Sequence, residues 1–445
     1  MKCLLSITGG LLGLLTLGAL AVALALTLGE LRRDAAPVSF QSPVETPTWS
    51  LYPPPITPAP SPPTMPAPPC TFVGRPALVE PDPSLEAHQF SEPRTVLTHT
   101  LAIGIVGWLP DNQHLLITRL LPDQAQESIE VFNIHTGEVR RYGERHSLPG
   151  KPVWLAAHQA VAFADVAPDQ QVVLRVSRGE RGAIETLVSG LASSFLAASP
   201  DGSQVVFFTQ AAPERPEVLD VATAQRQTFP ALPLTLWQDL STLGQVYGPE
   251  PYQAVWSPSG NQIAFYNDTG FYLIDWSSGQ TCEVNLGFEE SEAQYGKQWA
   301  IYIQWSPDGR YIGALTTIGD RPVSFVDLTL MDTNTGERRA LSPGPDVEYV
   351  YDFTWAPNSY QLIALAQAEI TQGRPIQKLY LVDVQTGLSQ SVMPHNVFGG
   401  GAIEGWQLAW SPDGQTLAVK CPAWLATEPT IVEDHICAIP VTRKP

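Results

Sequence analysis

The chain has 445 residues, which is too long for one ordinary compact core and indicates several domains, a repeat array or one large closed β-structure. Apolar residues make up 44% of the chain and charged residues only 16%, a balance that favours β-structure over helices with Lys- and Glu-rich surfaces. The formal net charge is −19 and no cluster of Lys and Arg exceeds a pair, so nucleic-acid binding is not expected. An acidic surface of this kind keeps a protein soluble and attracts cations or a basic partner.

The first segment is an apolar run. Residues Leu4–Gly29 carry no charge and are rich in Leu, Ala and Gly, and the run is long enough to cross a bilayer as a helix. We therefore predict an N-terminal transmembrane segment within residues 1–36. Its length favours an uncleaved signal-anchor over a cleaved signal peptide, although Ala23-Leu24-Ala25 offers a cleavage site. In both cases we expect the rest of the chain outside the cytoplasm, at the cell membrane.

A proline-rich segment follows. Residues Pro37–Pro69 contain 13 prolines in 33 positions. Because proline fixes φ and has no N–H to donate, this stretch cannot form a helix or a central strand. We predict an extended polyproline II spacer and, with the Pro-rich residues after it, assign residues 37–92 to a disordered linker. A ligand for a PxxP-reading domain is the alternative.

Five cysteines are present: Cys3, Cys70, Cys282, Cys421 and Cys437. None forms a C-x-x-C pair, so neither a zinc site nor a thioredoxin-like motif is indicated. Cys421 and Cys437 fall within one repeat of the array described next. They form a disulfide if the protein is exported, or remain as buried free thiols.

From Leu101 onward one pattern recurs: an apolar segment ends in Trp, a Pro-Asp-Gly-like turn follows, and an alternating strand comes next. The copies start at Trp108, Ala198, Trp256, Trp305, Trp355 and Trp410. Residues Trp154–Phe163 supply a degenerate copy without the turn. This gives seven units with a period of roughly 40–58 residues, or six if the degenerate unit forms no blade.

The turn chemistry explains the motif. In Ser306-Pro307-Asp308-Gly309, proline presets φ for the first central position, aspartate caps the turn with its side chain, and glycine accepts a positive φ. A second turn signature of the type Asp332-Thr333-Asn334-Thr335-Gly336 follows at a regular distance. Each unit therefore reads as a four-stranded meander, and we predict an all-β fold, a β-propeller of four-stranded blades over residues 93–445.

The repeated W-x-S-P-D-G-x-x-I-A-F string, followed by a strand ending in D-x-x-T-G, resembles the WD40-like repeat of the TolB-type propeller family. It is also similar to the propeller domains of prolyl oligopeptidase-type peptidases. The resemblance implies a β-propeller over most of the chain. The sequence departs from TolB in having seven units rather than six blades, and a Pro-rich linker instead of a separate amino-terminal domain.

The ends of the array predict how the ring closes. The last unit contains only three strands, at Gln407–Trp410, Thr416–Lys420 and Ile436–Val441. Residues Arg94–Thr98 resemble the fourth strands of other units, so we predict that they complete the last blade and remove its exposed edge.

The long irregular segments predict a binding face. In an antiparallel blade the short turns lie at one end, and the loops between second and third strands lie at the other end with the inter-blade connections. The long segments 232–251, 287–298, 394–405 and 421–435 all fall at this second end. Loops held by a rigid scaffold often carry binding residues, whereas the alternative is that they are tolerated insertions. The candidate binding residues are Trp237, Tyr247, Glu289, Glu290, Glu292, Tyr295, His395, Asn396 and Trp424.

Two repeated residue types invite other interpretations. The tryptophans of the motif could bind carbohydrate, but their fixed place in the repeat favours inter-blade packing. The turn aspartates Asp201, Asp308 and Asp413 could bind calcium, but turn capping explains them without a metal.

No enzyme motif was found. The chain lacks G-x-S-x-G, H-E-x-x-H, G-x-G-x-x-G and the phosphate-loop pattern, and no catalytic, metal or cofactor residue is predicted. The sequence therefore favours a membrane-anchored, non-catalytic binding scaffold outside the cytoplasm, with a protein or cell-envelope partner. The alternative is a propeller enzyme of the lactonase or glycan-processing type, with its site at the channel mouth.

Overall fold

The computed structural model describes residue 70 and residues 88–443, except segments 123–124, 180–181, 233–251, 268–269, 285–297, 319–325, 345–346, 348, 372–373, 394–397, 399–406 and 423–433. These residues belong to one compact unit, Thr64–Pro445. Their secondary structure is β throughout, apart from one 3-10 turn at Ala156–His158. The predicted membrane segment and most of the predicted linker lie outside the described residues. Within the described ranges, no helix is long and apolar enough to cross a membrane.

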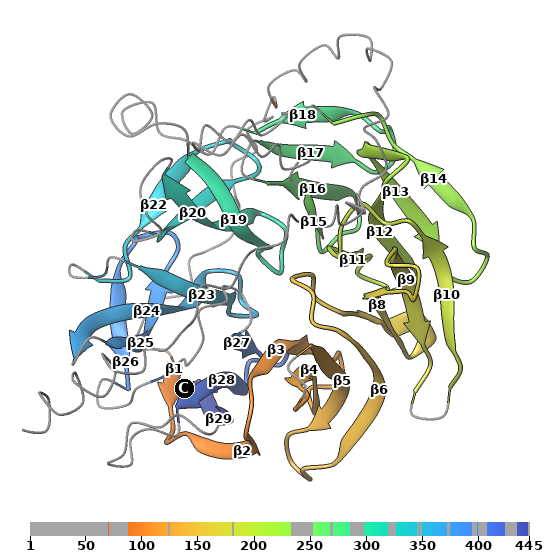
Figure 1. The fold of residues 1–445 in the computed structure, drawn as a ribbon. Helices are drawn as coiled ribbons and strands as arrows, with labels where there is room; N and C mark the ends of the chain where they lie inside the picture. Colours follow the sequence, from red (N-terminus) through yellow and green to blue (C-terminus); the bar gives the residue numbers. More distant parts are fainter. Residues whose placement is uncertain are drawn as a thin grey trace, which may run out of the picture. The chain divides into compact units, whose positions relative to one another are not determined.

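The strands form the seven blades of a β-propeller, as Figure 1 shows. Blades 1 to 3 contain β3 (Ile103–Trp108), β4 (His114–Leu120), β5 (Gln126–Asn133) and β6 (Val139–His146); β7 (Val153–Leu155), β8 (Ala160–Val166), β9 (Val172–Ser177) and β10 (Ile184–Ser189); and β11 (Ala197–Ala198), β12 (Gln204–Thr209), β13 (Ala212–Asp220) and β14 (Arg226–Thr228). Blades 4 to 6 contain β15 (Gln253–Trp256), β16 (Gln262–Tyr266), β17 (Phe271–Asp275) and β18 (Thr281–Glu283); β19 (Gln298–Trp305), β20 (Tyr311–Ile318), β21 (Val326–Asp332) and β22 (Arg338–Leu341); and β23 (Val350–Trp355), β24 (Gln361–Thr371), β25 (Arg374–Asp383) and β26 (Ser389–Val392). Blade 7 contains β27 (Leu408–Trp410), β28 (Thr416–Pro422) and β29 (Asp434–Arg443).

Neighbouring blades pack face to face. One apolar cluster joins Leu315 of blade 5 to Phe353 of blade 6, and the next joins Ile363 of blade 6 to Leu417 of blade 7. The innermost strands of adjacent blades also contact each other, including β27 of the last blade with β3 of the first. The core is therefore a ring of inter-blade layers around a central channel.

The predicted count of seven blades is confirmed. The degenerate unit at Trp154–Phe163 forms the first two strands of blade 2, with the 3-10 turn in place of the Pro-Asp-Gly turn. Gln159, one residue after the position of the motif glycine, has φ 47°, the left-handed conformation that glycine adopts more readily. Blade 2 therefore forms without a Pro-Asp-Gly turn, because its strands have the same hydrophobic pattern as those of the other blades.

The turn motif works as its chemistry predicts. The hydroxyl of Ser306 donates to Asp308 Oδ1 at 2.6 Å and accepts the N–H of Tyr311 at 2.8 Å, while Asp308 Oδ1 also accepts the N–H of Arg310. Gly309 has φ 73°. The same hydroxyl-to-carboxylate bond recurs at Asp201 and Asp413, so these aspartates are turn residues as interpreted from the sequence.

The motif tryptophans lie between blades. Trp108 Nε1 donates to the carbonyl of Ala409, Trp305 to Val255 and Trp355 to Gln304, and each acceptor belongs to the innermost strand of the preceding blade. Trp256 and Trp410 are buried as well. The interpretation as packing residues agrees with these contacts.

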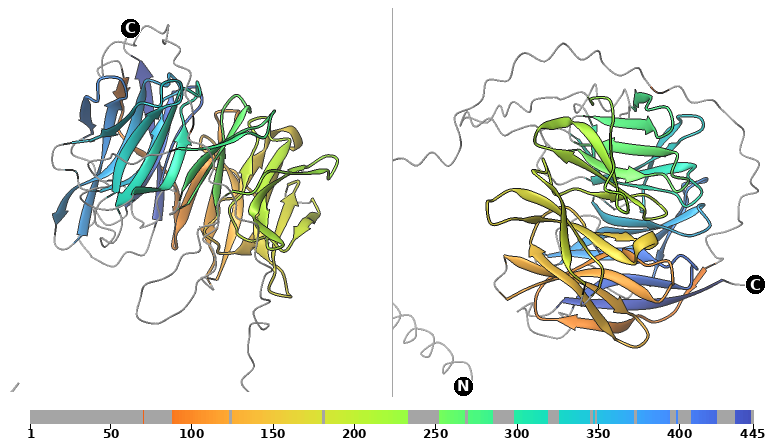
Figure 2. Two further views of the ribbon diagram at one scale, coloured as in Figure 1. Left: turned by 90° about the horizontal axis from the view of Figure 1, so that it is seen from above. Right: turned by 90° about the vertical axis from the view of Figure 1, so that its right-hand side faces the viewer.

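The ring closes as predicted from the sequence. Strand β2 (Arg94–His99) pairs antiparallel with β29 and supplies the outer strand of blade 7. A shorter strand, β1 (His88–Phe90), continues this outer edge by pairing with the last residues of β29. Figures 1 and 2 show the orange N-terminal strands beside the dark blue end of the chain. The assignment of residues 88–90 to the linker is corrected: they are part of the propeller.

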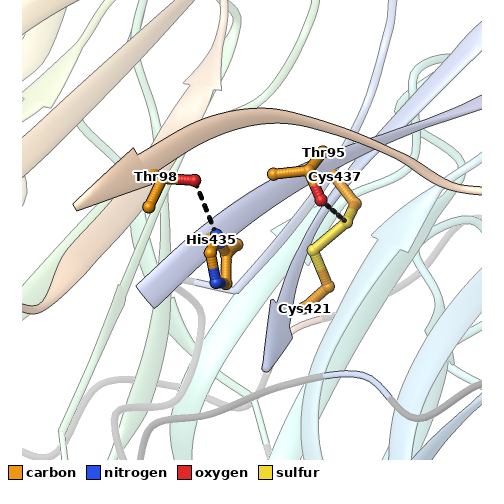
Figure 3. The surroundings of a disulfide bond; sticks show 5 residues. All are labelled: Thr95, Thr98, Cys421, His435 and Cys437. Carbon is orange, nitrogen blue, oxygen red and sulfur yellow. Dashed lines mark hydrogen bonds between the residues drawn. A yellow bond between two sulfur atoms is a disulfide. The ribbon is translucent and has the colours of Figure 1, made fainter. Parts of the chain in front are cut away.

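A disulfide joins Cys421 on β28 to Cys437 on β29, the strand that pairs with β2. Thr95 on β2 donates to Cys437 Sγ at 3.7 Å, and Thr98 bonds Nδ1 of His435 at 2.7 Å, as Figure 3 shows. The sequence left open whether Cys421 and Cys437 form a disulfide or remain as free thiols, and the structure shows the disulfide. Closing a loop with a sequence separation of 16 stabilises the fold by on the order of 3 kcal/mol in the chain-entropy model.

A second disulfide, absent from the sequence prediction, joins Cys70 to Cys282 on β18. The N–H of Cys70 also donates to the carbonyl of Glu283 at 2.9 Å. Cys70 is thus fastened to the outer strand of blade 4, whereas β1 belongs to blade 7.

Deleting residues 88–99 should lower the thermal unfolding midpoint by more than about 10 °C, because β29 then presents an unpaired edge and loses the packing of Val96 and Leu97. Differential scanning calorimetry of the full chain would measure it. Deletion of residues 48–59, which has the same length but falls in the Pro-rich segment, should leave the midpoint unchanged. Equal midpoints for the two deletions would contradict the role of the closure.

Candidate functional site

The nine binding residues predicted from the sequence all lie outside the described residues. The strands that flank their segments are described: 233–251 joins β14 to β15, 285–297 joins β18 to β19, and 423–433 joins β28 to β29. In the antiparallel blades, the ends of the strands that flank these segments lie at one end of the propeller, opposite the Pro-Asp-Gly turns. We call this end, which carries the inter-blade connections and the loops between second and third strands, the long-loop face.

The central channel contains a cavity of about 540 Å³. Its walls come from the innermost strands of blades 1 to 5 and from the connections that lead into β7 and β11. A cavity of this size is in the range of sites for small molecules. The described lining residues are Val106, Gly107, Trp108, Leu116, Pro149, Lys151, Pro152, Val153, Trp154, Phe195, Leu196, Ala197, Ala198, Gln253, Ala254, Val255, Trp256, Tyr266, Ile301, Tyr302, Ile303 and Gln304.

Lys151 brings a positive charge into this cavity. It lies in the connection between β6 and β7, at the end of the channel nearest the long-loop face. Its Nζ lies 5.0 Å from the centre of the Tyr302 ring, so an amine from blade 2 contacts an aromatic face of blade 5 across the channel. Burial lowers the pKa of Lys151 to about 8, although the nearby Asp352 opposes this shift.

The backbone around Lys151 is held firmly. The N–H of Gly150 donates to the hydroxyl of Ser194 at 3.0 Å. A Cβ at Gly150 would meet the carbonyl oxygen of Ser194 at 1.9 Å, so only glycine allows these two connections to approach so closely. Pro149 and Pro152 restrict φ on either side. The amine is therefore presented from a rigid segment.

Asp352 lies on β23, the innermost strand of blade 6. Its side chain is fully buried, and its two carboxylate oxygens accept the N–H groups of Phe353 and Gln407, each at 2.8 Å. Burial raises the pKa of Asp352 to about 7, while the charge of Lys151 and these N–H donors act in the opposite direction. The carboxyl thus contacts the backbone of β23 and of the residue that leads into blade 7.

Amide and phenol groups complete the polar part of the site. Gln304 donates to the hydroxyl of Tyr302 and, at 2.9 Å, to the carbonyl of Phe353 on the next blade. Tyr266 donates to Gln253 Oε1 at 2.9 Å. Burial raises the pKa of Tyr302 and of Tyr266, so both remain neutral hydroxyls at physiological pH.

Sequence reasoning missed Lys151 and Asp352, although the repeat contains a signal for the ring of side chains around them. The position three residues before the motif tryptophan lies at the same depth in each blade. In five of the seven units it is polar, where an innermost strand is otherwise apolar: Lys151, Gln253, Tyr302, Asp352 and Gln407. Lys151 stands at the same position, three residues before Trp154 of the degenerate unit, so the repeat register contained the signal for it as well.

No protein-family model matches the sequence, and no curated protein matches it. Among solved structures, the chain is similar to oligogalacturonate lyase from Vibrio parahaemolyticus, with a TM-score of 0.50 and 10% identity over 78% of this chain and 98% of that one. It is also similar to a putative TolB from Agrobacterium tumefaciens, with a TM-score of 0.43 and 14% identity over 79% of this chain and 94% of that one. At these identities the likeness describes the fold alone.

Asp352→Asn should change how stability depends on pH between about pH 4 and pH 7. In this window the unfolded carboxyl, with a pKa of 3.8, is ionised, whereas the folded carboxyl, with a pKa of about 7, keeps its proton. The folded state therefore binds more protons, and wild-type stability falls as the pH rises. The variant lacks this titration and should gain on the order of 3 kcal/mol over the wild type across the window, measured by urea unfolding.

Lys151→Met should have the opposite effect on the pH dependence of stability, measured in the same way. Removing the ammonium raises the pKa of Asp352 further, so the decline of stability with pH should become steeper and extend above pH 7. If the free energy of unfolding depends on pH in the same way in the wild type and in both variants, Asp352 does not titrate in this range and the prediction is wrong.

Proposed function

We propose that the protein is a membrane-anchored, extracytoplasmic β-propeller that binds a ligand in its central channel and does not alter it chemically. The ligand is a free molecule or an exposed group of a protein or cell-envelope partner, and it reaches the channel from the long-loop face. The observation that carries this proposal is the cavity on the channel, with aromatic and aliphatic walls and a few amide and phenol groups. The recurring Ser-Pro-Asp-Gly turns support assignment to the WD40-like repeat family.

Two disulfides support the extracytoplasmic part of the proposal. Four of the five cysteines are paired, as Cys70–Cys282 and Cys421–Cys437. Structural disulfides form and persist in oxidising compartments and are rare in the cytosol. The charge-free run at Leu4–Gly29 supports a single membrane anchor at the start of the chain.

A propeller enzyme is the second candidate, because the pKa values of Lys151 and Asp352 are both displaced toward neutrality. Catalysis at the cavity would need acid and base groups that reach the substrate. The described lining offers one amine but neither a carboxylate nor an imidazole, and Asp352, which is fully buried, is not part of it. Among the described residues, no group of His, Cys, Asp and Glu could hold a metal ion. These observations favour binding.

The redox state of the cysteines tests the compartment. Protein taken from the membrane fraction and denatured without reductant should contain at most one titratable thiol per chain, from Cys3, and four more after reduction. A count of five thiols before reduction would contradict an oxidising location.

Blocking the channel tests the binding site. Gly107 on β3 lines the cavity, and a Cβ built there meets no atom within 4 Å, so Gly107→Trp should fill the cavity without distorting the strand. Ile184→Trp adds similar bulk on the outer strand β10, at a position that is 44% exposed, and serves as the control.

The full-length protein and both variants would be extracted from membranes in mild detergent, and molecules released on unfolding would be identified by mass spectrometry. The wild type and Ile184→Trp should release a compound, unchanged, that Gly107→Trp lacks. Identical profiles from all three proteins would overturn the proposed site, and recovery of a chemically converted compound would favour the enzyme.

A further inference from the structure

Blade 3 has an alanine, Ala198, at the position of the motif tryptophan on its innermost strand. The other six units have an indole at this position: Trp108, Trp154, Trp256, Trp305, Trp355 and Trp410. A methyl group fills much less volume than an indole, whereas protein interiors are close-packed. The propeller therefore has one place at which a bicyclic ring of its own repeat is missing.

The other blades show where the missing indole would lie. Trp108, Trp305 and Trp355 each donate the Nε1–H to the preceding blade, at 3.0, 3.3 and 3.4 Å. In all three cases the acceptor is the carbonyl of the residue just before the motif tryptophan of that blade. In blade 2, which precedes blade 3, the equivalent residue is Val153 on β7. The missing ring would thus lie between Ala198 and Val153, with its N–H at the Val153 carbonyl.

This place is continuous with the channel cavity. Ala198 and Val153 both line the cavity, and both are only partly buried at the edge of the apolar cluster between blades 2 and 3. At the turn end of the same interface the two blades meet through main chain, where the N–H of Ala157 donates to the carbonyl of Asp201 at 3.1 Å. The interface is therefore closed at the turns, while the place of the missing ring borders the channel.

We propose that the cavity binds a small molecule with an indole-like ring, and that this ring takes the place of the missing tryptophan between blades 2 and 3. The inference rests on the proposed function and names its ligand class. The ring packs on Ala198 and Val153 and loses its contact with water, which is the main favourable contribution. Its N–H donates to the Val153 carbonyl, because a carbonyl oxygen has two lone pairs and can accept this bond in addition to a strand bond.

A matched pair of probes tests the ligand class. Indole and benzofuran have nearly the same bicyclic shape, but only indole has an N–H to donate. Binding of each would be measured by equilibrium dialysis with the full chain in lipid nanodiscs, with empty nanodiscs subtracted. The wild type should bind indole about fivefold more tightly than benzofuran, since one hydrogen bond contributes on the order of this ratio. Equal binding of the two probes would overturn the assigned class.

Ala198→Trp tests the assigned place. The new side chain supplies the ring that the other six units have, so the affinity for both probes should fall at least tenfold. Ile184→Trp, on the outer strand β10, is the matched control and should bind both probes as the wild type does. Undiminished binding by a folded Ala198→Trp would overturn the inference.

A smaller substitution decides the case if Ala198→Trp does not fold. Ala198→Leu fills part of the same space and should lower the affinity for indole at least threefold, with the thermal unfolding midpoint as the check on folding. Wild-type affinity in a folded Ala198→Leu would then overturn the inference.

Failure of the inference and failure of the proposed function give different results. If Gly107→Trp abolishes binding of both probes but Ala198→Trp does not, the cavity is the binding site and the place assigned to the ring is wrong. If Gly107→Trp leaves binding of both probes unchanged, the cavity is not the binding site and the proposed function fails as well. If the wild type binds neither probe, the indole-like class is wrong, and the compounds released from the wild type and from Gly107→Trp still decide the proposed function.

Discussion

The pairing of β2 with β29 is the interaction on which the rest of the molecule depends. It joins a strand that precedes blade 1 to the last strand of blade 7, and it thereby covers an edge that an open ring would leave unpaired. An ion pair reinforces the seam: Asp434 Oδ2 accepts Lys420 Nζ at 2.7 Å and the N–H of Ile103, the first residue of blade 1, at 3.0 Å. Lys420 is buried, so loss of either partner would leave an uncompensated charge.

The channel site exists only because the ring is closed. Lys151 comes from blade 2, Tyr302 from blade 5 and Asp352 from blade 6, and one carboxylate oxygen of Asp352 is held by the backbone of Gln407, which leads into blade 7. Each of these contacts joins segments that are far apart in the sequence. A change in the number of blades would alter the channel width and separate the amine from the ring that it faces.

The parts of the fold that were predictable from the sequence are those governed by local chemistry. The Ser-Pro-Asp-Gly turns, the Asp-x-x-x-Gly turns and the alternating strands are decided by residues within a few positions, so the blade architecture and even the closing strand could be read from the chain. Cys70–Cys282 could not, because a sequence separation of 212 gives no periodic signal. The site was missed for a similar reason. Loop length pointed to the long-loop face, but the distance between Lys151 and Tyr302 depends on the ring diameter, which no local pattern records.

The net charge of the chain and the charge of the cavity act at different ranges. A net charge of −19 creates a negative field that repels anions in solution, but salt screens this field over about 8 Å at physiological ionic strength. Lys151 acts at contact distance in a chamber of low dielectric, where screening is weak and a single charge has a larger effect.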